Sequence, residues 1–365
     1  MKVIVVGAGI SGLSTAWSLA KRGVEVTLLE QGPVPNPLSA SGDHHRIIRR
    51  AYGAQGGYQR RIGEAYEAWD EMWDDLGEKH LVDTGFLLVS QTGRDAAVAY
   101  RDSLVAGGYP VEDMSAGEAA RRHPFLDEAT IHSAAFSPEG GALLCRRIGA
   151  GLLSWLARAG VDVRAETRAE AVDPVRGAVR LSDGEELVAD HVVVTAGAWV
   201  LKLFPQLSDR LTGYRTAVAY LAPPEELVGA WEKAPVILDV GGTVDGYVLP
   251  PVRGAGLKVG AGIHKVRAAA DEKRVAEPGE GERLRDLFGP PFARIAEYRV
   301  TEVVTCAYTF TCDEHFFVTG DERATIVSAC SGHGYKFGAA VGRRVAEGVI
   351  SGDRAGLAGW LEARD

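Results

Sequence analysis

The first thirty residues constrain the fold of this chain more than any other stretch. An apolar, β-branched run at residues 3–6 leads into Gly7, Gly9 and Gly12, which form the pattern G-x-G-x-x-G. Apolar residues at helical spacing follow the last glycine, and a second apolar run ends at Glu30. This order of strand, glycines, helix, strand and acid predicts a Rossmann-like unit that binds a dinucleotide.

Each element of this fingerprint has a physical function. Gly7 allows a tight turn, Gly9 lets a pyrophosphate approach the backbone, and Gly12 lets the helix pack closely on the strand. The helix N-terminus offers N–H groups and partial positive charge to the phosphates. Glu30 follows Gly12 by 18 residues, near the usual place of a carboxylate that binds a ribose hydroxyl. Because an acid disfavours a 2′-phosphate, FAD or NAD fits better than NADP.

Composition excludes several classes of protein. With 365 residues, the chain is long enough for about two domains. The net charge of −9 and the lack of a basic tract argue against nucleic-acid binding. No apolar run reaches the roughly 20 residues of a membrane helix, and the first residues already belong to a predicted strand, so we expect neither a membrane span nor a signal peptide. The four cysteines form no C-x-x-C pair, which favours the cytoplasm and argues against a bound metal.

The periodicity along the chain predicts an α/β fold with a second, α+β domain. Helical spacing and apolar runs suggest a discontinuous Rossmann-like nucleotide-binding domain, at residues 1–80, 140–204 and 300–365. A β-sheet-rich substrate domain at residues 81–139 and 205–299 is interleaved with it. The stretches with helical spacing are residues 13–20, 58–76, 148–156, 282–288 and 339–350.

A ligand is expected between the two domains, at the carboxyl ends of the strands. One of these ends is the run at residues 192–195, which leads into a turn at Gly197. This turn either approaches the same dinucleotide or is a plain strand end. We expect the protein to be a monomer or a homodimer.

Four stretches together give a more specific indication. They are the N-terminal fingerprint, residues 46–53 (RIIRRAYG), residues 256–260 (GLKVG), and residues 306–337, which contain C-A-Y, D-E-H-F and S-G-H-G-Y-K-F. In this order they resemble the monomeric sarcosine oxidase and N-methyltryptophan oxidase family, within the D-amino-acid-oxidase-like flavoproteins. The resemblance covers nearly the whole chain, and it implies FAD as the cofactor of the nucleotide-binding domain.

The resemblance also implies a covalently bound flavin and a positively charged side chain that favours the reduction of O2. In the family, a cysteine seven residues before D-E-H-F is bonded through sulfur to the 8α-methyl of FAD, and Cys306 has this spacing from Asp313. The alternative is a small buried core cysteine. A family lysine beside the flavin, matched here by Lys258, favours the reduction of O2 through its charge. From the residues alone, Lys258 is a solvent-facing lysine on a half-buried strand.

Further site residues follow from the same resemblance. Arg49 and Lys336 match the pair that holds the substrate carboxylate, the arginine as a bidentate fork and the lysine as a point charge. Arg46 matches an arginine close to the flavin ring. Tyr247 matches an active-site tyrosine, although an ordinary strand aromatic is the alternative.

The C-terminal motif carries the last candidates. Gly332, His333 and Gly334 precede the final predicted helix. Glycines there permit close backbone approach to the flavin, and N–H groups can stabilise negative charge on the reduced ring. His333 is equally compatible with a structural hydrogen bond.

Two features depart from the family pattern. The position of an active-site histidine falls on Gly262, and His264 lies two residues further along. His44 and His45 precede the first arginine, where sarcosine oxidases have other polar residues. We therefore expect a differently shaped pocket and a substrate other than sarcosine.

Together these features predict an FAD-dependent amine oxidase. It would oxidise a secondary α-amino acid, N-methylated or cyclic, to an imine, with O2 as acceptor and H2O2 as product. A dehydrogenase of the same fold that passes electrons to a carrier, and a flavin-binding subunit without turnover, are alternatives. A nicotinamide-dependent enzyme is a further alternative, but in such an enzyme the C-terminal motif would have no function.

Overall fold

The N-terminal fingerprint forms the centre of a six-stranded sheet in the computed structural model, which describes residues 1–364. Strand β1 (Lys2–Val6) pairs in parallel with β2 (Glu25–Leu29) on one side and β13 (His191–Val194) on the other. Residues 3–6 are all buried, as expected for a central parallel strand. The outer strands are β9 (Asp162–Arg164), β21 (Ala324–Ser328) and the antiparallel β20 (Phe317–Asp321).

Alternate residues of β1 face two different layers. Val3 and Val5 pack among apolar residues of the helices, whereas Ile4 and Val6 pack against Val179 and other residues of a small sheet. The helices of the first layer are α1 (Ile10–Lys21), α2 (Gly56–Leu76), α5 (Cys145–Arg158), α9 (Gly338–Ser351) and α10 (Arg354–Glu362). The small sheet contains β10 (Ala169–Asp173), β11 (Ala178–Leu181) and β12 (Glu186–Val188).

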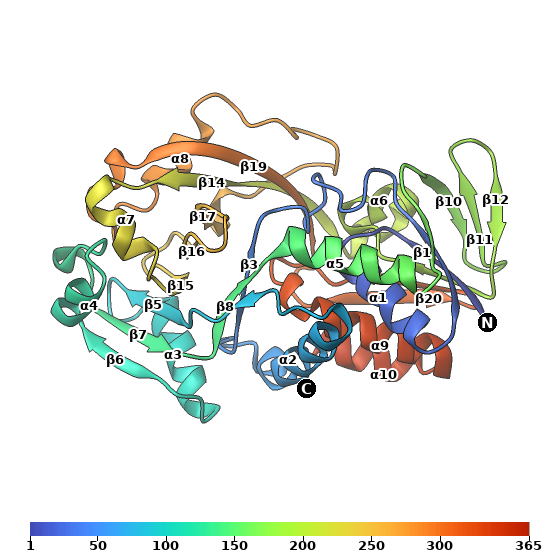
Figure 1. Ribbon diagram of the computed structural model, residues 1–365, viewed down its shortest axis with the longest axis horizontal. Helices are drawn as coiled ribbons and strands as arrows, with labels where there is room; N and C mark the ends of the chain where they lie inside the picture. The colour runs from blue at the N-terminus through green and yellow to red at the C-terminus, as the bar shows by residue number, and fades with distance from the viewer. Residues whose placement is uncertain (365) are drawn as a thin grey trace.

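A nine-stranded sheet forms the second domain, on the left and at the top of Figure 1. Its order is β18-β14-β17-β16-β15-β5-β7-β6, with β19 paired to β14. The strands are β5 (Phe86–Ser90), β6 (Glu112–Ser115), β7 (Ser133–Ser137), β14 (Thr212–Ala222), β15 (Val236–Asp239), β16 (Gly246–Leu249), β17 (Leu257–Ala261), β18 (Val266–Arg267) and β19 (Arg299–Phe310). Helices α3 (Ala96–Ala106), α4 (Ala116–Arg122), α7 (Glu225–Trp231) and α8 (Glu280–Asp286) accompany it.

Short elements connect the two domains. Strand β8 (Gly140–Leu143) pairs with β3 (Arg46–Arg49) and with β4 (Leu81–Val82). The start of the segment 81–139 and the residues that follow its end therefore meet here. Helix α6 (Val200–Leu203) follows β13. Within residues 1–364, no helix is both long and apolar enough to cross a lipid bilayer.

The two large sheets take their strands from alternating segments of the chain, and β19 lies in the nine-stranded sheet. Residues 299–310 were expected mostly in the nucleotide-binding domain, but they pair along β14 in the nine-stranded sheet. The long register from Thr212↔Phe310 to Ala222↔Arg299 holds this strand in the second domain. After β14, the chain therefore returns to the six-stranded sheet only with β20.

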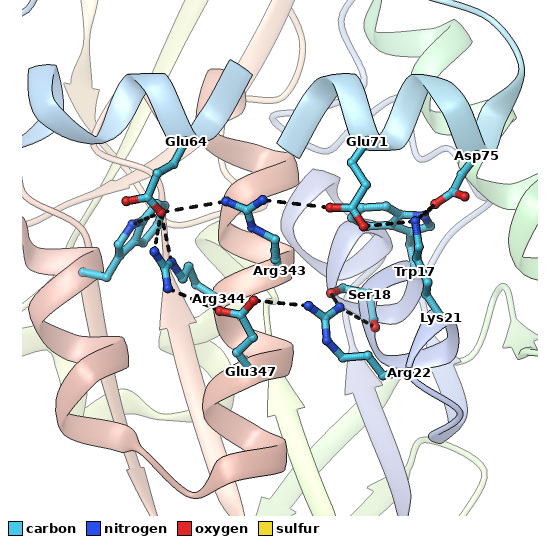
Figure 2. A network of polar contacts seen from close by, with 11 residues as sticks. Trp17, Ser18, Lys21, Arg22, Glu64, Glu71, Asp75, Arg343, Arg344 and Glu347 are labelled. Atoms are coloured by element: carbon cyan, nitrogen blue, oxygen red, sulfur yellow. Dashed lines mark hydrogen bonds and ion pairs between the residues drawn. The ribbon is translucent and has the colours of Figure 1, made fainter. Parts of the chain in front are cut away.

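Polar contacts tie together the outer surfaces of α1, α2 and α9 (Figure 2). Lys21 on α1 lies 3.0 Å from Glu71 and 2.6 Å from Asp75, both on α2. Arg343 on α9 lies 3.9 Å from Glu71, and Arg22 on α1 lies 3.2 Å from Glu347 on α9. Such half-exposed pairs contribute little individually, so apolar packing beneath them provides most of the stability.

The packing of α1 on α9 predicts the effect of one glycine substitution. A Cβ at Gly342 on α9 would lie 2.3 Å from the backbone carbon of Ser14 on α1, so Gly342→Ala must push the helices apart. We expect it to lower the free energy of unfolding by about 1–3 kcal/mol. Gly359→Ala is the matched control, because nothing lies within 4 Å of the added Cβ on α10. Urea unfolding of the purified protein checks this, and equal effects of both variants would contradict the packing.

Candidate functional site

A cavity of about 560 Å³ extends from the N-terminal glycines to the second sheet. Its wall includes residues from both ends of the chain and from the nine-stranded sheet. The predicted site residues that line it are Gly7, Gly9, Glu30, Arg46, Arg49, Gly197, Tyr247, Gly332, His333, Gly334 and Lys336. Lys258, Cys306 and Gly12 are not among the lining residues.

The glycine turn at the nucleotide end is shaped by two very close backbone approaches. Gly7 has φ +99°, and a Cβ there would lie 2.7 Å from the carbonyl oxygen of Thr195. A Cβ at Gly12 would lie 1.8 Å from the carbonyl oxygen of Gly7, so Gly12 serves the packing of helix on strand. At Gly9 the nearest atom, Ser41 Oγ, is 3.5 Å away. Packing does not require a glycine at this position, which leaves close approach of a ligand as its physical reason.

Glu30 is held in place and faces the cavity. Its Oε2 accepts a hydrogen bond from the backbone N–H of Ala8 at 2.8 Å, and its Oε1 accepts from Gly32 N at 3.1 Å and Asn36 Nδ2 at 2.9 Å. A carboxylate has about four acceptor positions, so Glu30 retains capacity for a hydroxyl of a bound ribose.

Arg49 and Lys336 are buried cations, each only 7% exposed, at the other end of the cavity. The guanidinium carbon of Arg49 lies 4.2 Å from the ring centre of Tyr52, and Lys336 Nζ lies 5.8 Å from the same centre. Arg49 donates to the carbonyl of Ala51, Lys336 donates to that of His333 at 3.1 Å, and Arg49 Nε has no partner among residues 1–364. Burial, with Arg49 and Arg46 nearby, lowers the pKa of Lys336 well below its usual range.

No carboxylate within residues 1–364 pairs with either of these cations. Placing positive charge in a buried site without an anion is unfavourable, so the pair is suited to an anionic ligand. The structure thus brings together the two residues expected to hold a substrate carboxylate.

Lys258 lies behind the cavity wall, in contact with a buried carboxylate. Its Nζ is 3.0 Å from Asp43 Oδ2 and also donates to the carbonyl of His45. Asp43 further accepts hydrogen bonds from Arg46 and from Tyr220. Burial alone would raise the pKa of Asp43, but Lys258, Arg46 and Tyr220 outweigh it and hold that pKa well below the usual range. Lys258 is completely buried, not solvent-facing, and its contact with a flavin stays a prediction.

Cys306 lies beside the cavity. It is 1% exposed, and its neighbours Ala307 and Tyr308 line the wall. Arg46 Nη2 donates to Cys306 Sγ at 3.6 Å and to the Tyr308 hydroxyl at 3.2 Å. The arginine expected near the flavin ring is therefore in contact with the cysteine expected to bind it, although the covalent bond itself stays a prediction.

The C-terminal motif forms a tight turn against the cavity. Gly332 has φ +75°, and a Cβ at Gly334 would lie 1.9 Å from the carbonyl oxygen of Ala329. The Nε2 of His333 lies 3.0 Å from the backbone oxygen of Glu314, and its ring is 4.7 Å from that of Phe316. Burial lowers the pKa of His333 well below its usual value, so the ring is neutral. These contacts support the structural interpretation of His333.

Comparison with known proteins agrees with this geometry. Residues 2–348 match the family model described as DAO, FAD dependent oxidoreductase. The chain belongs to this family. It is therefore an FAD-dependent oxidoreductase, and the resemblance found in the sequence is confirmed.

Two relatives and one solved structure illustrate the similarity. The monomeric sarcosine oxidase of Bacillus sp. (strain B-0618) is 28% identical, over 96% of this chain and 92% of the relative. The N-methyl-L-tryptophan oxidase of Yersinia pestis (strain Pestoides F) is 25% identical, over 93% of this chain and 92% of the relative. L-proline dehydrogenase from P. horikoshii superposes with a TM-score of 0.83 at 18% identity, over 99% of this chain and 96% of that one, which shows the fold.

The residues present fit the cofactor of the DAO family. The open glycine turn at Gly9 suits the pyrophosphate, and the fixed carboxylate of Glu30 suits the ribose of the adenosine half. The cavity continues from this end to Arg46 and the C-terminal glycines, where the isoalloxazine half would lie. When bound, FAD supplies the capacity to accept two electrons and a hydrogen from a substrate.

The three histidines at or near the departures from the family pattern, His44, His45 and His264, do not line the cavity of this oxidoreductase. His264 Nε2 lies 2.8 Å from Glu280 Oε1, in a cluster with Arg215. His44 lies 3.2 Å from Glu302, and His45 lies 3.3 Å from the carbonyl of Pro250. All three have structural partners, so none replaces the family histidine expected at Gly262.

A carboxylate from the neighbouring strand takes the place beside Gly262. In the register of β16 and β17, Gly246 is opposite Ala261, so Asp245 comes to lie beside Gly262. The Gly262 N–H donates to the Asp245 carbonyl at 2.8 Å, and a Cβ at Gly262 would lie 1.7 Å from Asp245 Oδ2. Asp245 lines the cavity. Sequence reasoning missed it because Asp245-Gly246 looks like an ordinary turn.

Other charged or aromatic lining residues were missed as well. Tyr100 and Lys265 belong to stretches without a recognisable motif, and only the fold brings them to the cavity. Glu314 is part of D-E-H-F, but the resemblance assigned it no function.

The contacts of Asp43 predict a strong effect of its substitution. Asp43→Asn leaves Lys258 and Arg46 buried without an anion, so we expect a loss of roughly 3–5 kcal/mol in the free energy of unfolding. Lys258→Met should cost less, because Asp43 keeps Arg46 and Tyr220. The double variant should recover part of the loss. Urea unfolding of the FAD-loaded protein measures all three.

Asp239→Asn is the matched control for this series. Asp239 is a buried carboxylate that accepts a hydrogen bond from Gly241 N at 2.7 Å, a bond that asparagine can also accept. Burial raises its pKa to about 6, so the neutral form is readily accommodated. If Asp43→Asn destabilised the protein no more than Asp239→Asn, the contacts of Asp43 with Lys258 and Arg46 would not contribute to stability as expected.

Proposed function

We propose that this enzyme oxidises a secondary α-amino acid, N-methylated or cyclic, to an imine, with O2 as acceptor and H2O2 as product. The observation that carries the proposal is the pair of buried cations, Arg49 and Lys336, that face the cavity without a carboxylate partner. They suit the carboxylate of an amino acid, the arginine as a fork and the lysine as a point charge. The named activities of the sarcosine and N-methyltryptophan oxidases support the same substrate class.

In this proposal the chain binds and orients the substrate. Arg49 and Lys336 hold its carboxylate, and Tyr247 and Tyr100 form part of the wall beside it. The reacting amine must be neutral to lose hydride from the adjacent carbon, and the nearby cations disfavour its protonated form. The substrate C–H would lose two electrons and its hydrogen to the cofactor, which leaves an iminium ion. Loss of the N–H proton to water gives the imine, which hydrolyses in water, or rearranges if it is cyclic.

The electron acceptor is a separate part of the proposal. Asp43 links Lys258 to Arg46, and Arg46 lines the cavity, so two cations share one carboxylate at this wall. This excess of positive charge favours the reduction of O2 nearby. A second candidate is a dehydrogenase with a carrier as acceptor, which the burial of Lys258 behind the wall favours.

The substrate class is tested by anaerobic mixing of the FAD-loaded enzyme with N-methyl and cyclic amino acids. We expect bleaching of the flavin absorbance and, for Arg49→Lys, a KM or dissociation constant raised roughly 10- to 100-fold, because lysine cannot form the bidentate contact. Arg50→Gln is the matched control: Arg50 pairs with Glu139 and lies over Tyr66, outside the lining residues.

Two results would contradict this proposal. If no N-alkyl or cyclic amino acid bleached the flavin, the substrate class would be wrong. Equal effects of Arg49→Lys and Arg50→Gln would remove Arg49 from the carboxylate site. Admission of air to the reduced enzyme then separates the acceptors: rapid reoxidation with stoichiometric H2O2 identifies an oxidase, and slow reoxidation identifies a dehydrogenase.

We also propose that Cys306 carries the FAD through a bond to its 8α-methyl. Arg46 donates to the sulfur at 3.6 Å, and cationic surroundings are typical of reactive cysteines. Acid precipitation of the wild-type protein should give a yellow pellet, and the Cys306→Ser pellet should be colourless. Cys330→Ser is the control, because Cys330 itself lines the cavity and should not matter. A colourless wild-type pellet would show that the flavin is not covalently bound.

A further inference from the structure

Asp245 is a charged residue of the cavity wall that the proposed chemistry does not use. Its backbone has φ +49°, in the left-handed region that aspartate tolerates better than most residues. Its side chain lies across Gly262, where any Cβ would collide with Oδ2 at 1.7 Å. A strained non-glycine residue that faces a ligand cavity indicates a functional constraint on that side chain.

The other charges of this wall are largely matched. Arg46 pairs with Asp43, Lys265 lies 3.5 Å from Glu314, and Glu30 accepts hydrogen bonds from N–H groups. Within residues 1–364, no hydrogen bond or ion pair involves the carboxylate of Asp245. Arg168, Glu170 and Arg180, on and beside the small sheet of β10 and β11, also line the cavity without an ion pair among the described residues. Away from that sheet, the wall is left with two unmatched cations, Arg49 and Lys336, and one unmatched anion, Asp245.

These unmatched charges lie at different depths. Arg49 and Lys336 are each 7% exposed, whereas Asp245 is exposed. Lys265 and Glu314, whose side chains are 32% and 52% exposed, act on Asp245 electrostatically, and the deeper Arg49 acts on it less strongly. A ligand whose carboxylate is held by the deep cations would therefore reach Asp245 with its outer part.

We propose that Asp245 is a specificity residue that binds a second, positively charged group in the side chain of the substrate. The preferred substrates are then N-substituted amino acids with a basic side chain, such as a terminal amine or guanidinium. The reaction in this inference rests on the proposed function, whereas the binding of a charged group by Asp245 does not depend on it.

The reacting amine itself is a poorer partner for Asp245. A carboxylate beside that amine would stabilise its protonated form, which cannot lose hydride. The amine also lies next to the substrate carboxylate, and hence near Arg49 and Lys336 at the deep end. A group further along the side chain satisfies Asp245 without opposing the reaction.

A series of ω-guanidino carboxylates of increasing length tests the binding directly. Each is compared with the ω-ureido carboxylate of the same length, which has nearly the same shape but no charge. Neither ligand contains an amine that can be oxidised, so their dissociation constants follow from the change in flavin absorbance of the FAD-loaded enzyme. We expect the guanidino ligand of the best length to bind about tenfold tighter than its ureido partner.

Asp245→Asn should abolish this preference, because asparagine tolerates the same backbone conformation but carries no charge. Glu314→Gln is the matched control, since it removes a cavity carboxylate that already pairs with Lys265, and most of the preference should survive. No preference in the wild-type protein at any length would overturn the inference. So would a preference that persists in Asp245→Asn or that Glu314→Gln reduces equally.

Turnover adds an independent readout. The ratio of kcat/KM for Nα-methylarginine over Nα-methylcitrulline should fall about tenfold in Asp245→Asn, with little change for the citrulline derivative. If neither compound reduced the flavin but the guanidino preference held, the proposed reaction would fail and the binding inference would stand. If both were oxidised without a preference, the reaction would stand and the assignment of Asp245 would fail.

Discussion

The buried carboxylate of Asp43 links the nucleotide-binding domain of this enzyme to its nine-stranded sheet. It belongs to the segment that follows the nucleotide fingerprint, and its partners Lys258 and Tyr220 belong to β17 and β14 of the nine-stranded sheet. A charge removed from water must be matched closely, so these contacts fix the segment against the second sheet. The third partner, Arg46, is thereby aimed at the cavity and at Cys306.

The nucleotide end of the site was predictable because its information is local. Gly7, Gly9, Gly12 and Glu30 lie within one strand–helix–strand unit, so their spacing alone determines where they meet. The same holds for the helices with clear apolar stripes. Strand β19 was assigned to the wrong sheet because its partner is β14, a long way off in the chain, and nothing in residues 299–310 indicates that pairing.

The substrate end depends on contacts between distant parts of the chain. Residue spacing gave no partner for Lys258, since Asp43 is 215 positions away, and the solvent-facing interpretation was wrong for that reason. Arg49 and Lys336 were found through the family resemblance, not through any local pattern. Asp245 was missed because it lies beside Gly262 only through the pairing of β16 with β17, which residue spacing along one strand does not indicate.

The unmatched charges explain why this site can be selective for its ligand. Arg49 is buried without an anion, and the pKa of Lys336 is lowered by its own burial and by Arg49 and Arg46, so in the proposed function a ligand that supplies negative charge relieves this electrostatic cost. A neutral amine of similar shape would leave the cations unmatched and would gain correspondingly less. In the proposed function, discrimination therefore arises from the uncompensated charge of the site itself. The contacts of Arg49 and Lys336 with Tyr52 and with the carbonyls of Ala51 and His333 hold the two cations in place.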